Sequence, residues 1–273
     1  MRTLRRVATI LLVTLLVLAL GLVLSVPFDR AITAGRVDAV TNVTFPASQA
    51  DAHPVAAYRA DPDGEGPHPA VVMIHEFWGL RSDIAGKADA LADLGYVVVA
   101  PDTFRGTSVN WVPSAIWNVI STPAESIDAD LRSVVDALAA DPTIDPDRIV
   151  VMGFCYGGGA ALRYSLSDPR LAGTGVFYGT LITEPDRLET LPGPLLGIFG
   201  EEDAQIPMDE VLAFERALQE TDVPHELYSW PGVGHAFVGS VEEIAEGGPP
   251  AEAWSTFTRW LEDVTATTTP TAP

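Results

Sequence analysis

Apolar and polar positions follow two patterns along most of the chain, one typical of buried strands and one typical of helices. Short apolar runs bounded by Gly, Pro or Asp predict strands over residues 37–45, 55–60, 70–74, 96–100, 148–153, 175–178, 195–200 and 225–230. Apolar residues three or four positions apart predict helices over residues 84–93, 124–140, 157–165, 208–220 and 251–264. Because the two kinds of segment alternate, the sequence predicts an α/β fold with a mostly parallel central sheet and helices on both faces.

The N-terminal segment follows neither of these two patterns. An apolar run extends from Val7 to Val26, interrupted only by Gly, Ser and Thr, and no amphipathic face can be drawn through it. As a helix this run is about 30 Å long, which is enough to cross a bilayer. A cleaved signal peptide has an apolar region of about 7–15 residues and then a small-residue cleavage site. Here Pro27, Phe28 and Asp29 follow instead, so we expect an uncleaved signal anchor, with secretion after cleavage as the alternative.

The charges before this run predict its orientation. Arg2, Arg5 and Arg6 are expected to stay in the cytoplasm, which makes the chain a single-pass cell-membrane protein with its domain on the extracytoplasmic side. The lipid bilayer is then a partner through residues 7–26. The expected organisation is a cytoplasmic tip and transmembrane helix over 1–28, a juxtamembrane spacer over 29–36, one domain over 37–264 and a disordered Thr/Pro-rich tail over 265–273.

The charge of the whole chain is strongly negative, with a formal net charge of −21 from 16 basic and 37 acidic side chains. Such a surface repels phosphate backbones, so nucleic-acid binding is not expected. Cys155 is the only cysteine, so no disulfide can form within the chain. The pattern specifies no oligomeric state.

Cys155 lies in a segment typical of a catalytic turn. The strand expected over 148–153 runs into Gly153-Phe154-Cys155-Tyr156-Gly157, and a helix of small residues follows. This is the nucleophile elbow G-x-S-x-G with Cys in place of Ser, where a Cβ on either flanking residue would strike the strand or the helix. The helix directs amide groups and its positive dipole end at the sulfur, which favours a nucleophile. The alternative is a small, buried hydrophobic residue.

A hydrolase with such an elbow needs an acid and then a histidine on loops after later strands. The strand expected over 195–200 runs into Asp203, and the strand expected over 225–230 runs into the glycine-flanked His235. Three other histidines lie in an early turn, an early loop and a strand, where they compete poorly for this role: His53, His68 and His225. The order Cys155, Asp203, His235 is therefore that of a hydrolase triad.

The loop after the strand expected over 70–74 carries a second informative segment, His75-Glu76-Phe77-Trp78-Gly79-Leu80. In a hydrolase of this kind that loop supplies one backbone N–H of an oxyanion hole, and the residue after the nucleophile supplies the other. Phe77 and Tyr156 are the expected donors. A zinc motif H-E-x-x-H would need a second histidine where Gly79 stands, so no metal site is expected, and no cofactor either.

Together these segments resemble the dienelactone hydrolase family over about residues 37–263. The resemblance rests on five motifs: His75-Glu76-Phe77-Trp78-Gly79-Leu80, Ala100-Pro101-Asp102, Gly153-x-Cys155-x-Gly157-Gly158, Gly200-x-x-Asp203 and Gly234-His235-x-Phe237. It implies an α/β-hydrolase fold and a triad in which Cys155 is the nucleophile, His235 the base and acid, and Asp203 the orienting carboxylate. It also implies that Glu76 keeps the thiol protonated at rest and accepts its proton when substrate binds.

Two positions depart from the pattern of this family. Members that act on dienelactone bind its carboxylate with arginines, and Gly239 stands where one of them is expected, four residues after the histidine. The other arginine follows the Pro-Asp loop, and Arg105 is offset from it by one residue. Arg105, Trp78 and Trp111 are candidate substrate contacts. Ile116, Trp117 and Ile120 join Trp111 in a segment where this fold often carries a lid, and they are expected either to line an acyl pocket or to pack in the core.

The function expected from these residues is that of a carboxylic ester hydrolase acting on a small-molecule ester or lactone through a cysteinyl thioester. Dienelactone itself is not expected as the substrate, because of Gly239. Thioesterase or broad carboxylesterase action is a second interpretation. The third is a catalytically silent fold that serves as a binding or scaffold protein.

Overall fold

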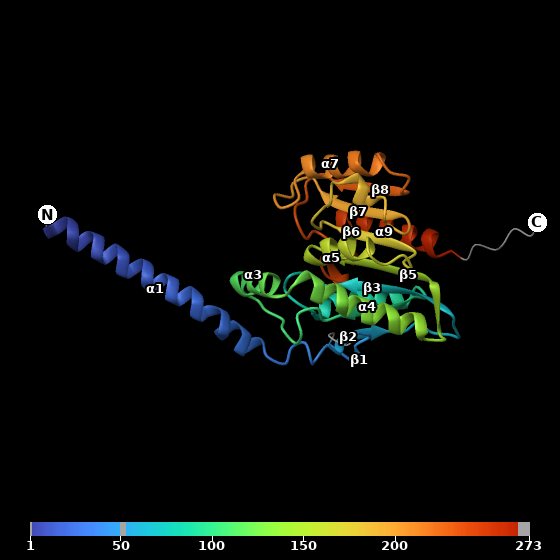
Figure 1. Ribbon diagram of the computed structural model, residues 1–273, viewed down its shortest axis with the longest axis horizontal. Helices are drawn as coiled ribbons and strands as arrows, with labels where there is room; N and C mark the ends of the chain where they lie inside the picture. Colours follow the sequence, from blue (N-terminus) through green and yellow to red (C-terminus); the bar gives the residue numbers. More distant parts are fainter. Residues whose placement is uncertain (1, 50–52, 267–273) are drawn as a thin grey trace, which may run out of the picture.

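A single eight-stranded sheet forms the centre of the computed structural model, which describes residues 2–49 and 53–266 (Figure 1). The strands are β1 (Val43–Phe45), β2 (Val55–Ala60), β3 (His68–Ile74), β4 (Val97–Pro101), β5 (Ile144–Phe154), β6 (Gly173–Phe177), β7 (Leu195–Gly200) and β8 (His225–Trp230). Their order in space is β1-β2-β4-β3-β5-β6-β7-β8. β1 and β2 pair antiparallel with their neighbours, and all other pairs are parallel. The prediction of a mostly parallel sheet is confirmed.

Helices cover both faces of this sheet. One face is covered by α2 (Ser82–Ala92), α8 (Val241–Ala245) and α9 (Pro249–Thr265), and the other by α4 (Ala124–Ala140), α5 (Tyr156–Ser165) and α7 (Met208–Gln219). Successive side chains of a strand point to opposite faces, so β3 feeds two cores. Val71 and Met73 join the cluster under α2 and α9, whereas Val72 and Ile74 join the cluster under α4. The expected α/β fold with helices on both faces is confirmed.

The strand expected over 37–45 is wrong in its first half. Residues 37–40 form hydrogen-bonded turns, in which the Val40 N–H donates to the Val37 carbonyl at 2.9 Å. The Asn42 side-chain amide then hydrogen-bonds both backbone groups of Arg59. It donates to the Arg59 carbonyl and accepts from the Arg59 N–H, each at 2.8 Å. A side chain thus replaces the next pair of the strand ladder, and the strand begins only at Val43. The structure also contains three helices that the sequence pattern did not predict: α3 (Val112–Ser121), α6 (Pro185–Leu188) and α8.

The N-terminal helix α1 (Arg2–Thr33) projects away from the rest of the protein (Figure 1). Its segment Thr9–Thr33 is long and apolar enough to cross a membrane, with a mean hydropathy of 2.8 in its most apolar window, and that window is not buried by the protein. α1 continues through Thr33, so the expected spacer over 29–36 is helical in its first five residues. Of the tail expected over 265–273, Thr265 ends α9, and residues 267–273 lie outside the described residues.

Candidate active site

The turn between β5 and α5 holds Cys155 in a backbone conformation that is rare for a residue with a side chain, with φ 54° and ψ −117°. The glycines beside it are required by close backbone approach. A Cβ at Gly153 would lie 2.2 Å from the Gly157 carbonyl oxygen, and a Cβ at Gly157 would lie 2.3 Å from the Ile74 carbonyl oxygen. β5 lies in the middle of the sheet, so this elbow places Cys155 above the carboxyl ends of the parallel strands.

Gly157→Ala is expected to lower the free energy of unfolding by about 2–4 kcal/mol, because the added methyl group has no room against the backbone after β3. Urea unfolding followed by tryptophan fluorescence measures the loss. Gly86→Ala in α2 is the control, since a Cβ there would only touch Val241 Cγ2 at 3.4 Å. Equal midpoints for Gly157→Ala and the wild type would contradict this account of the elbow.

Two loops at the same edge of the sheet bring a histidine and a carboxylate to the sulfur. His235 Nε2 lies 2.9 Å from Cys155 Sγ, and His235 Nδ1 lies 2.7 Å from Asp203 Oδ2. Asp203 is buried, and its Oδ1 accepts the N–H groups of Gln205 at 2.7 Å and Ile206 at 3.0 Å. These backbone bonds fix the carboxylate, and the carboxylate fixes the orientation of the imidazole. The arrangement is suited to proton transfer at the sulfur.

Two backbone amides also converge on the sulfur. The backbone N–H groups of Tyr156 and Phe77 both favour the thiolate of Cys155, so they are placed to act on negative charge that develops at this sulfur or on a carbonyl group bound to it. Burial raises the pKa of the Cys155 thiol to about 11, the two amides oppose this shift, and the charges of Glu76 and Asp203 add to it. The free thiol is therefore protonated at neutral pH.

Glu76 lies partly buried in the loop between β3 and α2. Burial raises the pKa of its carboxyl group, and the charge of Lys87 opposes this shift more than any other charge does. His235 and Arg81 act in the same direction as Lys87, whereas Asp83 acts against them. A carboxylate with a raised pKa, close enough to raise the pKa of the thiol in turn, is a suitable acceptor for the thiol proton.

Glu76→Gln is expected to lower the pKa of Cys155, because it removes a negative charge that disfavours the thiolate. The thiolate is the form that reacts with iodoacetamide, so alkylation should be slow near neutral pH in the wild type and faster at each pH in the variant. Between about pH 7 and about pH 10, below the pKa of the thiol, the rate rises with pH as the thiolate fraction does, and the displacement of this rise along the pH axis gives the pKa shift. Glu189→Gln, an exposed residue, is the control. A rise that stays in place, or moves to higher pH, in Glu76→Gln would refute this electrostatic coupling.

Trp78 and Arg105, two of the candidate substrate contacts, are placed differently. Trp78 packs on Phe77 with ring centroids 4.4 Å apart, so it belongs to the loop that carries Glu76. Arg105 is turned to α4, where it donates to Ser126 Oγ at 2.6 Å and pairs with Asp130 Oδ1 at 3.5 Å. Its guanidinium is thus already paired with a carboxylate.

Trp111, the third candidate substrate contact, lies where α3 meets α1. Its side chain is 46% exposed, and its indole N–H donates to Ser25 Oγ at 3.0 Å. The structure therefore brings together Cys155, His235, Asp203, Glu76, Phe77, Tyr156 and Trp78, and it leaves Arg105 and Trp111 in other contacts.

Two buried residues support this site and were not singled out for that role from the sequence. The Tyr178 ring lies 5.2 Å from the His235 ring, and its position at the end of a predicted strand is the one signal that could have indicated it. His75 Nδ1 contacts the Glu76 carbonyl at 2.7 Å, and His75 Nε2 accepts the Thr103 N–H at 3.2 Å. Burial lowers the pKa of His75 to about 4, so a neutral imidazole holds the two loops together.

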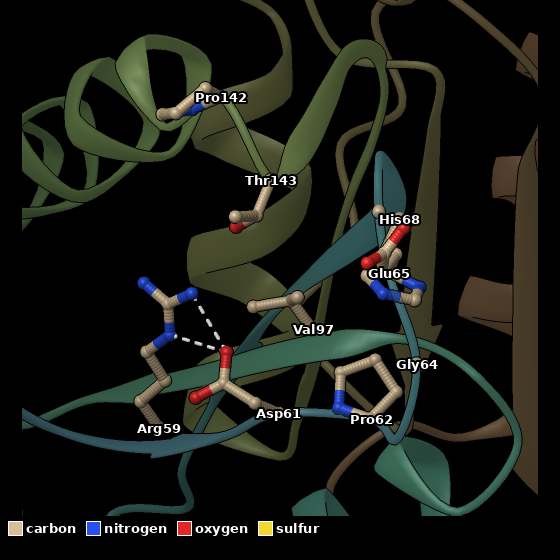
Figure 2. Close-up of a pocket in the computed structure, with 10 residues that line it drawn as sticks. Arg59, Asp61, Pro62, Gly64, Glu65, His68, Val97, Pro142 and Thr143 are labelled. Atoms are coloured by element: carbon tan, nitrogen blue, oxygen red, sulfur yellow. Dashed lines mark hydrogen bonds and ion pairs between the residues drawn. The ribbon is translucent and has the colours of Figure 1, made fainter.

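A cavity of about 510 Å³ lies at the opposite end of the strands (Figure 2). Its lining includes His68 and Val97, the first residues of β3 and β4, so it opens at the amino ends of the parallel strands. Arg59 lines this cavity, and its guanidinium already pairs with Asp61 at 2.7 Å and with Asp141 at 3.0 Å. This cavity is separate from the cluster around Cys155, which lies at the carboxyl ends.

Comparison with known proteins agrees with this geometry. The model of the dienelactone hydrolase family matches residues 55–265, from the start of β2 to the end of α9. The chain belongs to the dienelactone hydrolase family. A relative named "Putative carboxymethylenebutenolidase" from Synechocystis sp. is 29% identical over 217 residues, which cover 73% of this chain and 88% of the relative. A relative of the same name from Escherichia coli is 28% identical over 249 residues, which cover 86% of this chain and 88% of the relative. A Klebsiella pneumoniae structure named "Putative Dienelactone Hydrolase" is 27% identical with a TM-score of 0.71, over 80% of this chain and 96% of the other.

Membership confirms the expectation of an ester or lactone hydrolase of the dienelactone hydrolase type. This dienelactone hydrolase family member differs from the expected pattern beside its histidine. A Cβ at Gly239 would overlap the Glu243 carboxylate, whose Oε2 accepts the Ser240 N–H at 2.9 Å as a cap of α8. Negative charge therefore occupies the space beside Gly239, where a positive side chain was expected. An anionic group of a substrate is disfavoured at this place.

Proposed function

We propose that this protein is a membrane-anchored hydrolase that cleaves neutral esters or lactones through a thioester on Cys155. The observation that carries the proposal is the continuous contact from Cys155 Sγ through His235 to Asp203. The amides of Phe77 and Tyr156 at the same sulfur complete the set of groups that acyl transfer needs. With every position filled, catalysis is favoured over a silent binding or scaffold protein.

In this mechanism the thiol proton passes to Glu76 as substrate binds, and the sulfur attacks the carbonyl carbon. The oxyanion forms at the amides of Phe77 and Tyr156. As it collapses, the ester C–O bond breaks, and the departing alkoxide takes up the proton released by the thiol. His235 then removes a proton from water, and the hydroxide attacks the thioester. The carboxylic acid leaves, and His235 returns the proton to Cys155.

We also propose that α1 remains on the mature protein as a signal anchor and holds the domain on the extracytoplasmic side. The segment Thr9–Thr33 has the length and hydropathy of a membrane span. Contacts at its end favour retention over cleavage, since Trp111 donates its backbone N–H to Asp29 Oδ2 at 3.3 Å and its indole N–H to Ser25 Oγ. Removal of α1 would leave these polar groups of the domain without their partners.

The test of the proposed activity uses the full chain in detergent with p-nitrophenyl acetate and then with a pair of lactones that differ only by a carboxylate. We expect the neutral lactone to have a kcat/KM at least about 10-fold higher, because Glu243 and not a cation lies beside Gly239. Equal rates, or a preference for the anionic lactone, would contradict the neutral substrate class. A folded protein that turns over none of the three substrates would contradict the hydrolase proposal.

A further inference from the structure

α3 and the residue before it, Trp111, present large apolar side chains to the outside of the protein. The exposed fractions are 46% for Trp111 and Val112, 47% for Ile116, 52% for Trp117 and 74% for Ile120. Of the two alternatives expected for the tryptophans and isoleucines of this segment, packing in the core is therefore wrong. Several large apolar side chains on one short helix form a patch of the kind that marks an interaction surface.

The end of α1 holds α3 through polar contacts. Trp111 is bound to Asp29 and Ser25 of α1, and Arg30 of α1 donates to Asn118 Oδ1 of α3. Asp29 and Asn118 are buried in this junction. Figure 1 shows α3 near the end of α1, on the side of the protein from which α1 projects. The apolar patch of α3 thus lies beside the end of the apolar run of α1.

We infer that α3 lies in the surface of the bilayer that α1 spans, with Trp117 and Ile120 in the lipid. This inference rests on the membrane anchoring proposed above. The apolar run of α1 ends at Val26, so the junction with α3 falls at the membrane–water interface, the depth at which tryptophan is favoured. A helix in this plane buries its apolar face about 5–10 Å into the boundary of headgroups and acyl chains.

The composition of α3 specifies which lipids it needs. Residues 112–121 contain no charged side chain, and the chain as a whole carries a formal net charge of −21. Attraction to anionic headgroups therefore contributes nothing, and burial of apolar area is the driving force. A neutral phosphatidylcholine surface is sufficient, and anionic lipid should not strengthen the contact.

Docking of α3 holds the candidate active site at the lipid surface. The Val109 N–H donates to the Trp78 carbonyl at 2.9 Å, and Arg81 donates to the Val109 carbonyl and to Asn110 Oδ1 at 2.9 Å. The segment between β4 and α3 is thereby fastened to the loop that carries Glu76. Esters and lactones that partition into the bilayer are concentrated at this surface, so the substrate class is narrowed to lipophilic ones.

The test places one nitroxide at a time on the full chain in phosphatidylcholine vesicles, in a Cys155→Ser background, and compares collisions with oxygen and with a water-soluble nickel chelate. Leu16→Cys reports on the anchor, Leu212→Cys on an exposed apolar position of α7, and Ile120→Cys on α3. We expect lipid-like collisions at 16, water-like collisions at 212, and lipid-like collisions at a shallower depth at 120. Trp117→Cys, the second reporter on α3, should behave as Ile120→Cys does.

Water-like collisions at positions 120 and 117, with position 16 in lipid, would overturn the docking of α3 and leave the anchor intact. Water-like collisions at position 16 would contradict the anchor itself, and the inference with it. A lipid-like signal at position 120 that appears only after anionic lipid is added would contradict the apolar driving force.

Discussion

Cys155→Ala is expected to lower kcat/KM for p-nitrophenyl acetate by at least about 10³-fold, because it removes the atom that forms the acyl-enzyme. His235, Asp203 and the two amides remain in place, so a small residual rate from binding and oxyanion stabilisation is expected. The full chain in detergent provides the assay, with far-UV circular dichroism as the check on folding. Ser167→Ala, an exposed position shortly after α5, is the matched control and should keep the wild-type rate.

Cys155→Ser is a second test of the nucleophile. The hydroxyl group has the same neighbours, but its much higher intrinsic pKa makes it a poorer nucleophile without a strong base. We expect an activity between those of the alanine variant and the wild type. Wild-type activity in a folded Cys155→Ala variant would show that another residue carries the reaction, and the proposed triad would then be wrong.

Asp203→Asn is expected to lower kcat by about 10³–10⁴-fold with little change in KM. An amide has the shape of the carboxylate, and it can still accept the N–H groups of Gln205 and Ile206 through one oxygen. Its NH₂ group would then face His235 Nδ1, which favours the tautomer that carries a proton toward the sulfur and cannot accept one. Asp209→Asn, an exposed residue of α7, is the control. A loss confined to KM would contradict the orienting role of Asp203.

The elements that the sequence predicted best are those whose apolar face meets the core. The helix expected over 124–140 has the bounds of α4, because Ile127, Leu131 and Leu138 all lie buried on one side of it. α3 was missed for the opposite reason. It turns apolar residues outward and carries no charged residue on any side, so it lacks the polar face that identifies a surface helix.

Some residues of the candidate site could be predicted from their neighbours along the chain, and others depend on contacts between distant segments. The elbow around Cys155 depends on adjacent residues, and the chain order of Asp203 and His235 follows from the fold, so these positions could be predicted from the sequence. The position of Lys87 over the Phe154 ring could not be predicted, since it depends on the packing of α2 against the end of β5, which is distant along the chain. Arg105 was predicted as a substrate contact from its place after the Pro-Asp loop, but Asp130, which follows it by 25 residues in the chain, pairs with it instead.

The most direct test of the proposed chemistry is to trap the acyl-enzyme. The full chain is mixed with p-nitrophenyl acetate, quenched in acid within one turnover and analysed by intact mass and peptide mapping. We expect one added acetyl group per chain, located on Cys155 and labile to hydroxylamine. It should be longer-lived in Asp203→Asn, in which His235 activates water poorly. An acetyl group on another residue, or turnover with no covalent intermediate on Cys155 in either protein, would contradict the proposed chemistry.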